Sequence, residues 1–262
     1  MIKFLSGTSN PRELCVACAR IAYRSSHLAS PAEDARLLSS LVKRGHRAIT
    51  EFARIVFEID VGPEILIEFM ARTHGWVLTD NILSLNPRTL WDGRSLTLGK
   101  MLIDETPQEY LDLVYGPTCK ELGGVYYDTT SKVSIWNEFE FINNEHSFRV
   151  VRIRASRGLM DELFRHRLGA MVGTSTRRVP MNDLYIELPD TPESNQYIQA
   201  MFNVYNMLKQ KGGLDEARKV FPLGAHCNFV YGTSYSHWDY IKNLRTSKGA
   251  HKEFKEIFID LP

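Results

Sequence analysis

The stretch "FRVVRIRASRGLMDELFRHRLGA", residues 148–170, decides the fold class because it joins a strand pattern directly to a helix pattern. In its first nine residues, Val151 and Ile153 point to one side and Arg152 points to the other, as in a half-buried strand. The remainder has apolar residues at helical spacing, and we expect this helix to end near Gly169. A strand that leads into a helix indicates a protein of mixed secondary structure.

Similar patterns alternate along the rest of the chain. Helices are expected over residues 10–23, 30–46, 62–76, 106–124 with a break around Gly116 and Pro117, 192–213, 214–222 and within 236–260, and a further strand over 53–61. Ser30 and Pro31 are residue types that begin a helix, and Gly45 is a type that ends one. No linker-like segment interrupts the pattern, so one compact α/β or α+β domain over residues 1–262 is predicted.

Two parts of the sequence resemble each other. The segments "EFARIVFEIDVGPEILIEFMARTHG", residues 51–75, and "EHSFRVVRIRASRGLMDELFRHRLG", residues 145–169, both run from a glutamate through a strand pattern and a helix pattern to a basic tip. The pairs at one constant spacing are Glu51 with Glu145, Ile59 with Ile153, Glu68 with Glu162 and Gly75 with Gly169. Two copies are too few for a solenoid, so the likeness is either a duplicated strand–helix unit or a coincidence.

The composition excludes several classes of protein. The chain has 262 residues, of which 44% are hydrophobic, and a formal net charge of +1, which argues against a nucleic-acid coat or a membrane-surface protein. It has no long apolar run and no secretory leader pattern, so a cytoplasmic location is expected. Cys15 and Cys18 form a C-x-x-C within an apolar helix stripe, which favours packing over a metal or redox site.

Positive charge gathers in "RHRLGAMVGTSTRR", residues 165–178, although the whole chain is nearly neutral. Guanidinium groups beside a loop rich in glycine and hydroxyl residues suit a phosphate or a carboxylate. The alternative is a set of ordinary helix-surface ion pairs, because Asp161 and Glu162 precede Arg165 by four and three residues. Taken together, the cluster favours a site for one small anion over a site for a polymer.

Other candidate residues are scattered along the chain. They are His46 and Glu51 in "RGHRAITEF", Arg218 in "LDEARKVFP", and Arg245 and His251 in "LRTSKGAH". Turn residues of this kind often carry function. Taken singly, each is better explained by a structural role.

Several motifs together resemble the flavin-dependent thymidylate synthases. "RHRLGAMVGTS" matches that family's signature of R-H-R, seven residues and a serine. "GHRAITEF" is similar to its G-H-x-S-x-x-E-H element, "LDEARKVFPL" to its E-x-A-R-x-x-L-P element, and "YIKNLRTSKGAHKEF" to its C-terminal segment. The matches follow the family's order over roughly residues 1–257, with residues 90–140 as an insert.

The resemblance implies a fold, an assembly and a reaction. The fold is a mainly antiparallel sheet flanked by helices, and the assembly is a homotetramer with active sites where subunits meet. The reaction methylates dUMP at C5 to give dTMP, with methylenetetrahydrofolate as the carbon donor and FAD, reduced by NADPH, as the hydride source. The flavin carries the chemistry and the protein orients it, and no metal is expected. The near-zero net charge and the lack of a long apolar run give no reason to expect a nucleic acid or a membrane as partner.

The resemblance also implies roles for individual residues. The nucleotide would be held by Glu162, Arg165, Ser175, Arg177, Arg218 and Arg245. The flavin would lie against His46, Glu51, His166 and Arg167. The catalytic set would be Arg165, His166, Arg167 and Ser175.

The sequence departs from the family pattern near the motif serine. Gly173 and Thr174 stand where members have a Glu or Gln element, Arg178 replaces a tyrosine, and Phe52 replaces the histidine of the E-H pair. A pocket with more room and one more donor can accept a further acceptor group, such as a ribose 2′-hydroxyl. Methylation or hydroxymethylation of another pyrimidine nucleotide such as UMP, and a non-catalytic nucleotide-binding role, are therefore the alternatives.

Overall fold

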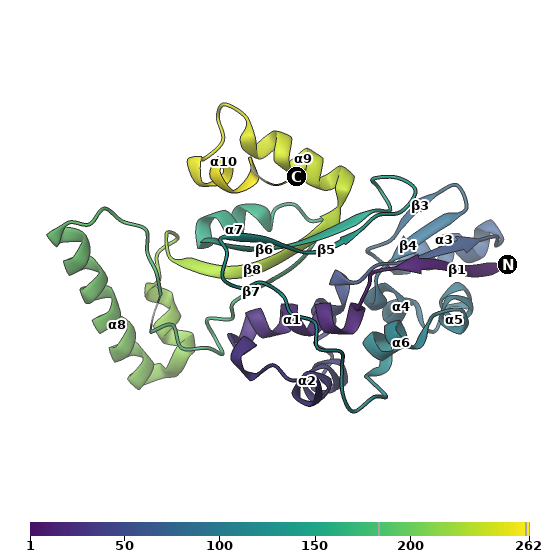
Figure 1. The fold of residues 1–262 in the computed structure, drawn as a ribbon, viewed down its shortest axis with the longest axis horizontal. Coiled ribbons are helices and arrows are strands. Elements are labelled where there is room, and N and C mark those ends of the chain that lie inside the picture. Colours follow the sequence, from purple (N-terminus) through teal and green to yellow (C-terminus); the bar gives the residue numbers. More distant parts are fainter. Residues whose placement is uncertain (183, 260, 262) are drawn as a thin grey trace.

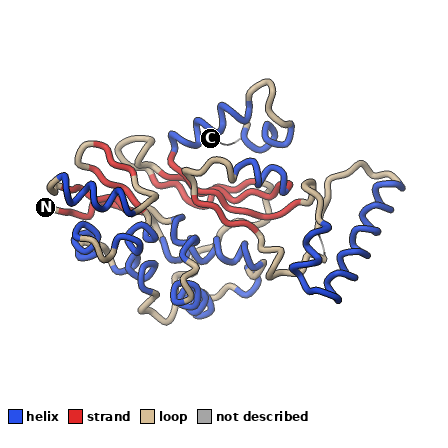
Figure 2. Tube along the Cα trace, turned by 180° about the vertical axis from the view of Figure 1, so that it is seen from behind, coloured by secondary structure: helices blue, strands red, loops and turns tan. Residues whose placement is uncertain are grey.

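The computed structural model describes residues 1–182, 184–259 and 261, and its strands form two four-stranded antiparallel sheets. The first sheet has the order β1 (Ile2–Gly7), β2 (Ile55–Ile59), β4 (Ile82–Leu85) and β3 (Val77–Thr79). The second has the order β5 (Val133–Phe139), β6 (Phe148–Ser156), β8 (His226–Ser234) and β7 (Ala170–Gly173). Figures 1 and 2 show the two sheets following each other along the long axis of the molecule. The expected antiparallel arrangement is thus confirmed, but with two sheets where one was expected.

Helices cover both sheets. They are α1 (Pro11–Tyr23), α2 (Pro31–Lys43), α3 (Pro63–Arg72), α4 (Pro87–Gly93), α5 (Thr97–Asp104), α6 (Gln108–Tyr115), α7 (Arg157–Leu163), α8 (Pro192–Ala217), α9 (Tyr235–Thr246) and α10 (Lys252–Phe258), with short 3-10 turns η1 (Ser26–Leu28), η2 (Arg47–Phe52) and η3 (Arg218–Val220). Helix α1 packs on one face of the second sheet with α2 against α1, and α7, α9 and α10 pack on the other face (Figure 1). Among the described residues, no helix is both long and apolar enough to cross a bilayer.

Local sequence signals place most of these elements. Helices α1, α2 and α3 each begin with a proline, and the Ser30 hydroxyl accepts a hydrogen bond from the Glu33 amide at 3.3 Å. The predicted break after residue 213 is a kink inside α8, where Gly213 has a φ of 72°. Cys15 and Cys18 are fully buried in the core beneath the second sheet, in agreement with the packing interpretation.

Three sequence expectations require correction. Helix α7 ends at Leu163 and not near Gly169, because the chain must reverse before β7 begins to pair with β8. Residues 117–124 are not helical, since α6 ends at Tyr115 and is followed by Gly116, whose φ is 104°, and then by a proline. The C-terminal helix pattern forms two helices, α9 and α10, separated by residues 247–251.

The two sheets have the same internal order and the same connections. We call residues 2–7 and 51–93 the N-terminal repeat, and residues 133–173 and 226–246 the C-terminal repeat. Along the chain, the N-terminal repeat contains β1, β2, α3, β3, β4 and α4, and the C-terminal repeat contains β5, β6, α7, β7, β8 and α9. In both sheets the last strand in the chain lies between the second strand and the third. The chain departs from this plan where α1 and α2 follow β1, and where residues 174–225, including the protruding α8, separate β7 from β8 (Figure 1).

Strand register shows that the first three strands of each sheet, in sheet order, correspond residue by residue. The fourth strand is offset by one residue, since Val77 pairs with Ser84 but Ala170, and not Met171, pairs with Gly232. In the first sheet Phe4 pairs with Phe57, one residue bulges out, and Ser6 then pairs with Val56. In the second sheet Ile135 pairs with Val151, one residue bulges out, and Asn137 then pairs with Val150. Both partners on the inner strands are 94 positions apart, the same spacing as in the sequence. A bulge at the same place in both sheets favours a duplicated unit over coincidence.

Candidate active site

The R-H-R residues 165–167 lie in the turn between α7 and β7, with one pocket on each side. The first pocket has a volume of about 800 Å³ and includes Glu162, Arg165 and Arg245 in its wall, and we call it the α7 pocket. The second has a volume of about 620 Å³ and includes Glu51 and Arg167, and we call it the boundary pocket because both repeats line it. Two residues of one motif, Arg165 and Arg167, therefore line two different cavities.

In the α7 pocket, one carboxylate holds two arginines. An Nη of Arg245 lies 3.0 Å from one oxygen of Glu162, and an Nη of Arg165 lies 2.9 Å from the other. Arg165 is largely exposed, whereas Arg245 is only 18% exposed and packs on the ring of Phe254. The structure thus brings together three of the residues predicted to hold the nucleotide.

His166 connects the motif to α9. Arg245 donates to its Nε2 at 3.1 Å, which requires Nε2 to be the unprotonated nitrogen of a neutral ring. Burial lowers the pKa of His166 below its ordinary value, and the charges of Arg245 and His237 lower it further. The ring is therefore held as a neutral acceptor, with the rings of His237 and Tyr240 against it.

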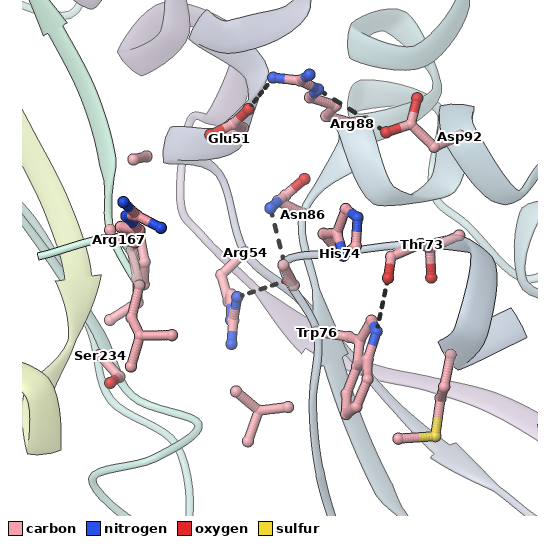
Figure 3. Close-up of a pocket in the computed structure, with 17 residues that line it drawn as sticks. Glu51, Arg54, Thr73, His74, Trp76, Asn86, Arg88, Asp92, Arg167 and Ser234 are labelled. Atoms are coloured by element: carbon pink, nitrogen blue, oxygen red, sulfur yellow. Dashed lines mark hydrogen bonds and ion pairs between the residues drawn. The ribbon is translucent and has the colours of Figure 1, made fainter. Parts of the chain in front are cut away.

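In the boundary pocket, Glu51 and Arg167 face the same space from different repeats (Figure 3). Glu51 forms an ion pair with Arg88, which also lies 3.8 Å from Asp92. Burial raises the pKa of Glu51, while the Arg88 charge opposes that shift. Two of the four residues predicted to contact the flavin thus line one cavity.

The remaining predicted residues lie elsewhere. Arg177 makes a bidentate contact with Asp215 at 2.8 and 3.2 Å, and Arg218 lies 3.6 Å from the same carboxylate. Ser175 donates its amide to the Ala22 carbonyl at 2.8 Å. Neither pocket, as far as the described residues line it, includes Ser175, Arg177, Arg218 or the exposed His46.

Sequence reasoning missed two features of the boundary. Arg54 is buried at the start of β2 and lines the boundary pocket. An intact E-H pair occurs at Glu145 and His146, in the C-terminal repeat, whereas the N-terminal repeat has Phe52 at the position of the histidine. The constant spacing of 94 residues was the signal that could have found it, because it aligns Phe52 with His146.

One known protein family matches the C-terminal part of the chain. Residues 142–261 match the family model described as "Thymidylate synthase complementing protein". Two solved structures of the thymidylate synthase ThyX from Helicobacter pylori, both with FAD and dUMP, are 21% identical and cover 45% of this chain and 67% of their own, with TM-scores of 0.38 and 0.39. No curated protein matches the sequence.

The family match includes the R-H-R turn, α9 and α10, and it leaves the N-terminal repeat outside. It therefore covers the wall of the α7 pocket but only one side of the boundary pocket. Over residues 142–261, this match confirms the resemblance of the chain to the flavin-dependent thymidylate synthase family.

Proposed function

We propose that this protein is a flavin-dependent enzyme that methylates dUMP at C5, with methylenetetrahydrofolate as the carbon donor and NADPH as the reductant. The observation that carries the proposal is the division of the R-H-R turn between two pockets. Arg165 serves the α7 pocket, Arg167 serves the boundary pocket, and the neutral His166 lies between them. Such a turn is suited to hold two ligands side by side.

The α7 pocket supplies the contacts that a nucleotide phosphate requires. Arg165 is exposed and can exchange its ion pair with Glu162 for a phosphate, because a surface pair of this kind contributes little free energy. Arg245 is held by Glu162 and His166, so its guanidinium keeps one orientation. In this assignment Arg165 binds the anion, and Glu162 and Arg245 fix the geometry around it.

The boundary pocket fits FAD by the chemistry of its donors. Arg167 reaches it from the C-terminal repeat, and Arg54 has a buried Nε without a hydrogen-bond partner. The Trp76 ring forms part of the wall and offers a planar surface. When bound, FAD would supply hydride transfer, and these side chains would hold and orient it.

Three of the residues predicted to hold the nucleotide, Ser175, Arg177 and Arg218, support a shared active site. They lie outside both pockets, and Arg177 and Arg218 both lie within ion-pair distance of Asp215. We assign these three residues to the nucleotide site of another copy in a homotetramer, where a phosphate would displace Asp215. Symmetric oligomers commonly build sites from two copies of one surface.

The experiment that tests the function supplies FAD to the purified protein and measures retained flavin absorbance. The loaded protein then receives dUMP or UMP separately, with methylenetetrahydrofolate and NADPH, and the products are identified by mass. We expect conversion of dUMP to dTMP. No retained flavin absorbance together with no product from either nucleotide would refute the proposal. A product from UMP alone would show that UMP, and not dUMP, is the substrate.

A complementation experiment tests the shared site. Arg165→Ala and Arg177→Ala are each expected to abolish most turnover, because each removes one side of the nucleotide site. Co-expression of the two variants is expected to restore part of it, since some sites then receive both intact surfaces. No recovery in mixed oligomers of confirmed composition would place both residues in one subunit's site or exclude one of them.

A further inference from the structure

The boundary pocket lies where the two repeats meet in a two-fold arrangement. It is lined by residues 73–77 and by residues 167–170, which are the corresponding helix-to-strand turns of the two repeats. It is also lined by Asn86 and Ser234, the residues that cap α4 and α9 after corresponding strands. Corresponding parts of both repeats therefore surround one cavity.

Contacts across the boundary follow the same symmetry. Arg54 corresponds to Phe148, and the guanidinium of Arg54 lies 5.6 Å from the Phe148 ring centroid. Ser84 lies 2.9 Å from His146. A Cβ added at Gly232, which occupies the position of Ser84, would lie 3.1 Å from Phe52, which occupies the position of His146. These paired contacts show that the repeats are related by an approximate two-fold axis near the pocket.

Arg54 is the unusual residue in this arrangement. It is only 6% exposed, and one Nη donates to the Gly75 carbonyl at 3.2 Å while its Nε has no partner. Within the described part of the chain, no carboxylate lies in ion-pair distance of Arg54. Burial lowers its pKa to about 10, so the side chain still carries its charge at neutral pH. A buried cation without a counter-ion is costly, and an anion in the pocket would remove that cost.

The other charges of the pocket do not supply the anion. Glu51 and Asp92 both face Arg88 on the far wall (Figure 3). With Arg54 and Arg167, the described lining carries three guanidiniums against two carboxylates, so it keeps a net positive charge. Arg167 faces the pocket from the C-terminal repeat, and Figure 3 shows Arg54 between Arg167 and Trp76. Two guanidiniums from different repeats thus converge on one space beside an indole ring.

We propose that the boundary pocket is an anion site shared by the two repeats, in which Arg54 and Arg167 hold the phosphate or carboxylate of one ligand that carries a planar ring system. The proposal rests on the proposed function and deepens it, because FAD is assigned to the same pocket there. It adds the N-terminal repeat, through Arg54, as a part of the binding machinery. The carboxylates of a folate are the second source of the same chemistry.

Calorimetry with FAD, dUMP and folate as separate probes tests the proposal on the intact protein. Arg54→Gln is expected to weaken the binding of FAD or folate at least about tenfold, the usual effect of losing a charge-assisted hydrogen bond, and Arg54→Lys is expected to restore part of it. Arg152→Gln is the matched control, since Arg152 is 1% exposed but lines neither pocket. Unchanged affinity in Arg54→Gln, or no binding of FAD or folate to the wild type, would overturn the proposal.

Fluorescence gives a second measurement should Arg54→Gln not fold. A ligand in the boundary pocket is expected to quench Trp76, so Trp76→Phe should remove most of the quenching, and Trp136→Phe should not. Equal quenching in both variants would place the ligand elsewhere. Folate binding that depends on Arg54, without any flavin binding, would support the anion site and refute the proposed function. Flavin-dependent turnover that is unchanged in Arg54→Gln would support the proposed function and refute the anion site.

Discussion

The N-terminal and C-terminal repeats share a backbone plan but carry different chemistry. At the tip of α7 the C-terminal repeat has the R-H-R motif, where the N-terminal repeat has Ala71, Arg72 and Thr73. At the boundary, in turn, the N-terminal repeat has Arg54 where the C-terminal repeat has Phe148. Strand order and the register of the first three strands have been kept while the charged residues have diverged. We infer that the sheet and its bulge define the scaffold of each repeat, and that the turns define what the repeat binds.

The largest expected effect lies at two corresponding glycines, Gly75 and Gly169, one in each repeat. Gly75 has a φ of 80°, and an added Cβ would lie 2.6 Å from an Asn86 nitrogen, while a Cβ on Gly169 would lie 2.3 Å from the Tyr231 hydroxyl. Gly75→Ala is expected to destabilise the fold by about 2–4 kcal/mol and Gly169→Ala by about 1–3 kcal/mol, because both overpack a close approach and the first adds backbone strain. Urea denaturation measures both.

Gly224→Ala is the control for these substitutions. An added Cβ at Gly224 would meet no atom within 4 Å, and its φ is not in the left-handed region. Its free energy of unfolding should change by less than about 0.5 kcal/mol. Equal effects at all three glycines would show that the close contacts are not what requires glycine.

A second test removes one arginine from each repeat, Arg165 in the turn after α7 and Arg72 at the end of α3. Arg165→Ala is expected to weaken dUMP binding by about 1.5–3 kcal/mol, the value of a charge-assisted hydrogen bond to a phosphate. Arg72 is the residue of the N-terminal repeat that corresponds to His166. Arg72→Ala should leave dUMP affinity unchanged, because Arg72 lines neither pocket. Calorimetry of both variants decides the matter, and comparable losses would contradict the division of labour between the repeats.

The sequence predicted the elements better than their arrangement. The alternation in 148–156 and the proline at the start of α3 are local signals, and both elements formed where they were expected. The predicted end of α7 was wrong, because the end is decided by the pairing of β7 with β8, which lies about sixty residues further along the chain. The second sheet was missed for the same reason, since hydrophobic patterns do not record which strands pair.

The candidate site was predictable in part. The motif spacing led to Arg165 and Arg167, but not to the fact that they face different pockets, since a turn and not a helix carries them. Arg54 gave no signal, because a single arginine before a strand is common and only burial makes it unusual. His146 could have been found from the repeat, which aligns it with Phe52.

The third prediction concerns this aligned pair and pH. Burial lowers the pKa of His146, the Arg54 charge lowers it further, and Glu145 partly opposes the shift. The unfolded chain then binds the proton more readily than the folded one, so stability is complete above about pH 6.5 and is lost as the pH falls from there. The expected loss is about 1.4 kcal/mol for each unit of lowering.

His146→Phe, which installs the residue of the other repeat, is expected to flatten the pH dependence between pH 7 and pH 5. Thermal unfolding across this range measures it. Because His166, His226 and His237 also have lowered pKa values, part of the acid sensitivity should persist. A profile identical to that of the wild type would mean that His146 is protonated as readily in the folded chain as in the unfolded one.

The smallest expected effect lies at the two helix caps that face the boundary pocket. The Asn86 side chain accepts a hydrogen bond from the Thr89 amide at 2.9 Å, and the Ser234 side chain accepts one from the His237 amide at 3.4 Å. Loss of a cap costs about 0.5–2 kcal/mol, and the shorter bond should lie at the upper end. Asn86→Ala is therefore expected to cost about 1 kcal/mol and Ser234→Ala about 0.5 kcal/mol in urea denaturation.

The exchange variants Asn86→Ser and Ser234→Asn should each retain most of the cap, since both residue types serve this position. A larger loss in Ser234→Ala than in Asn86→Ala would show that the two caps are not ordered by their bond lengths.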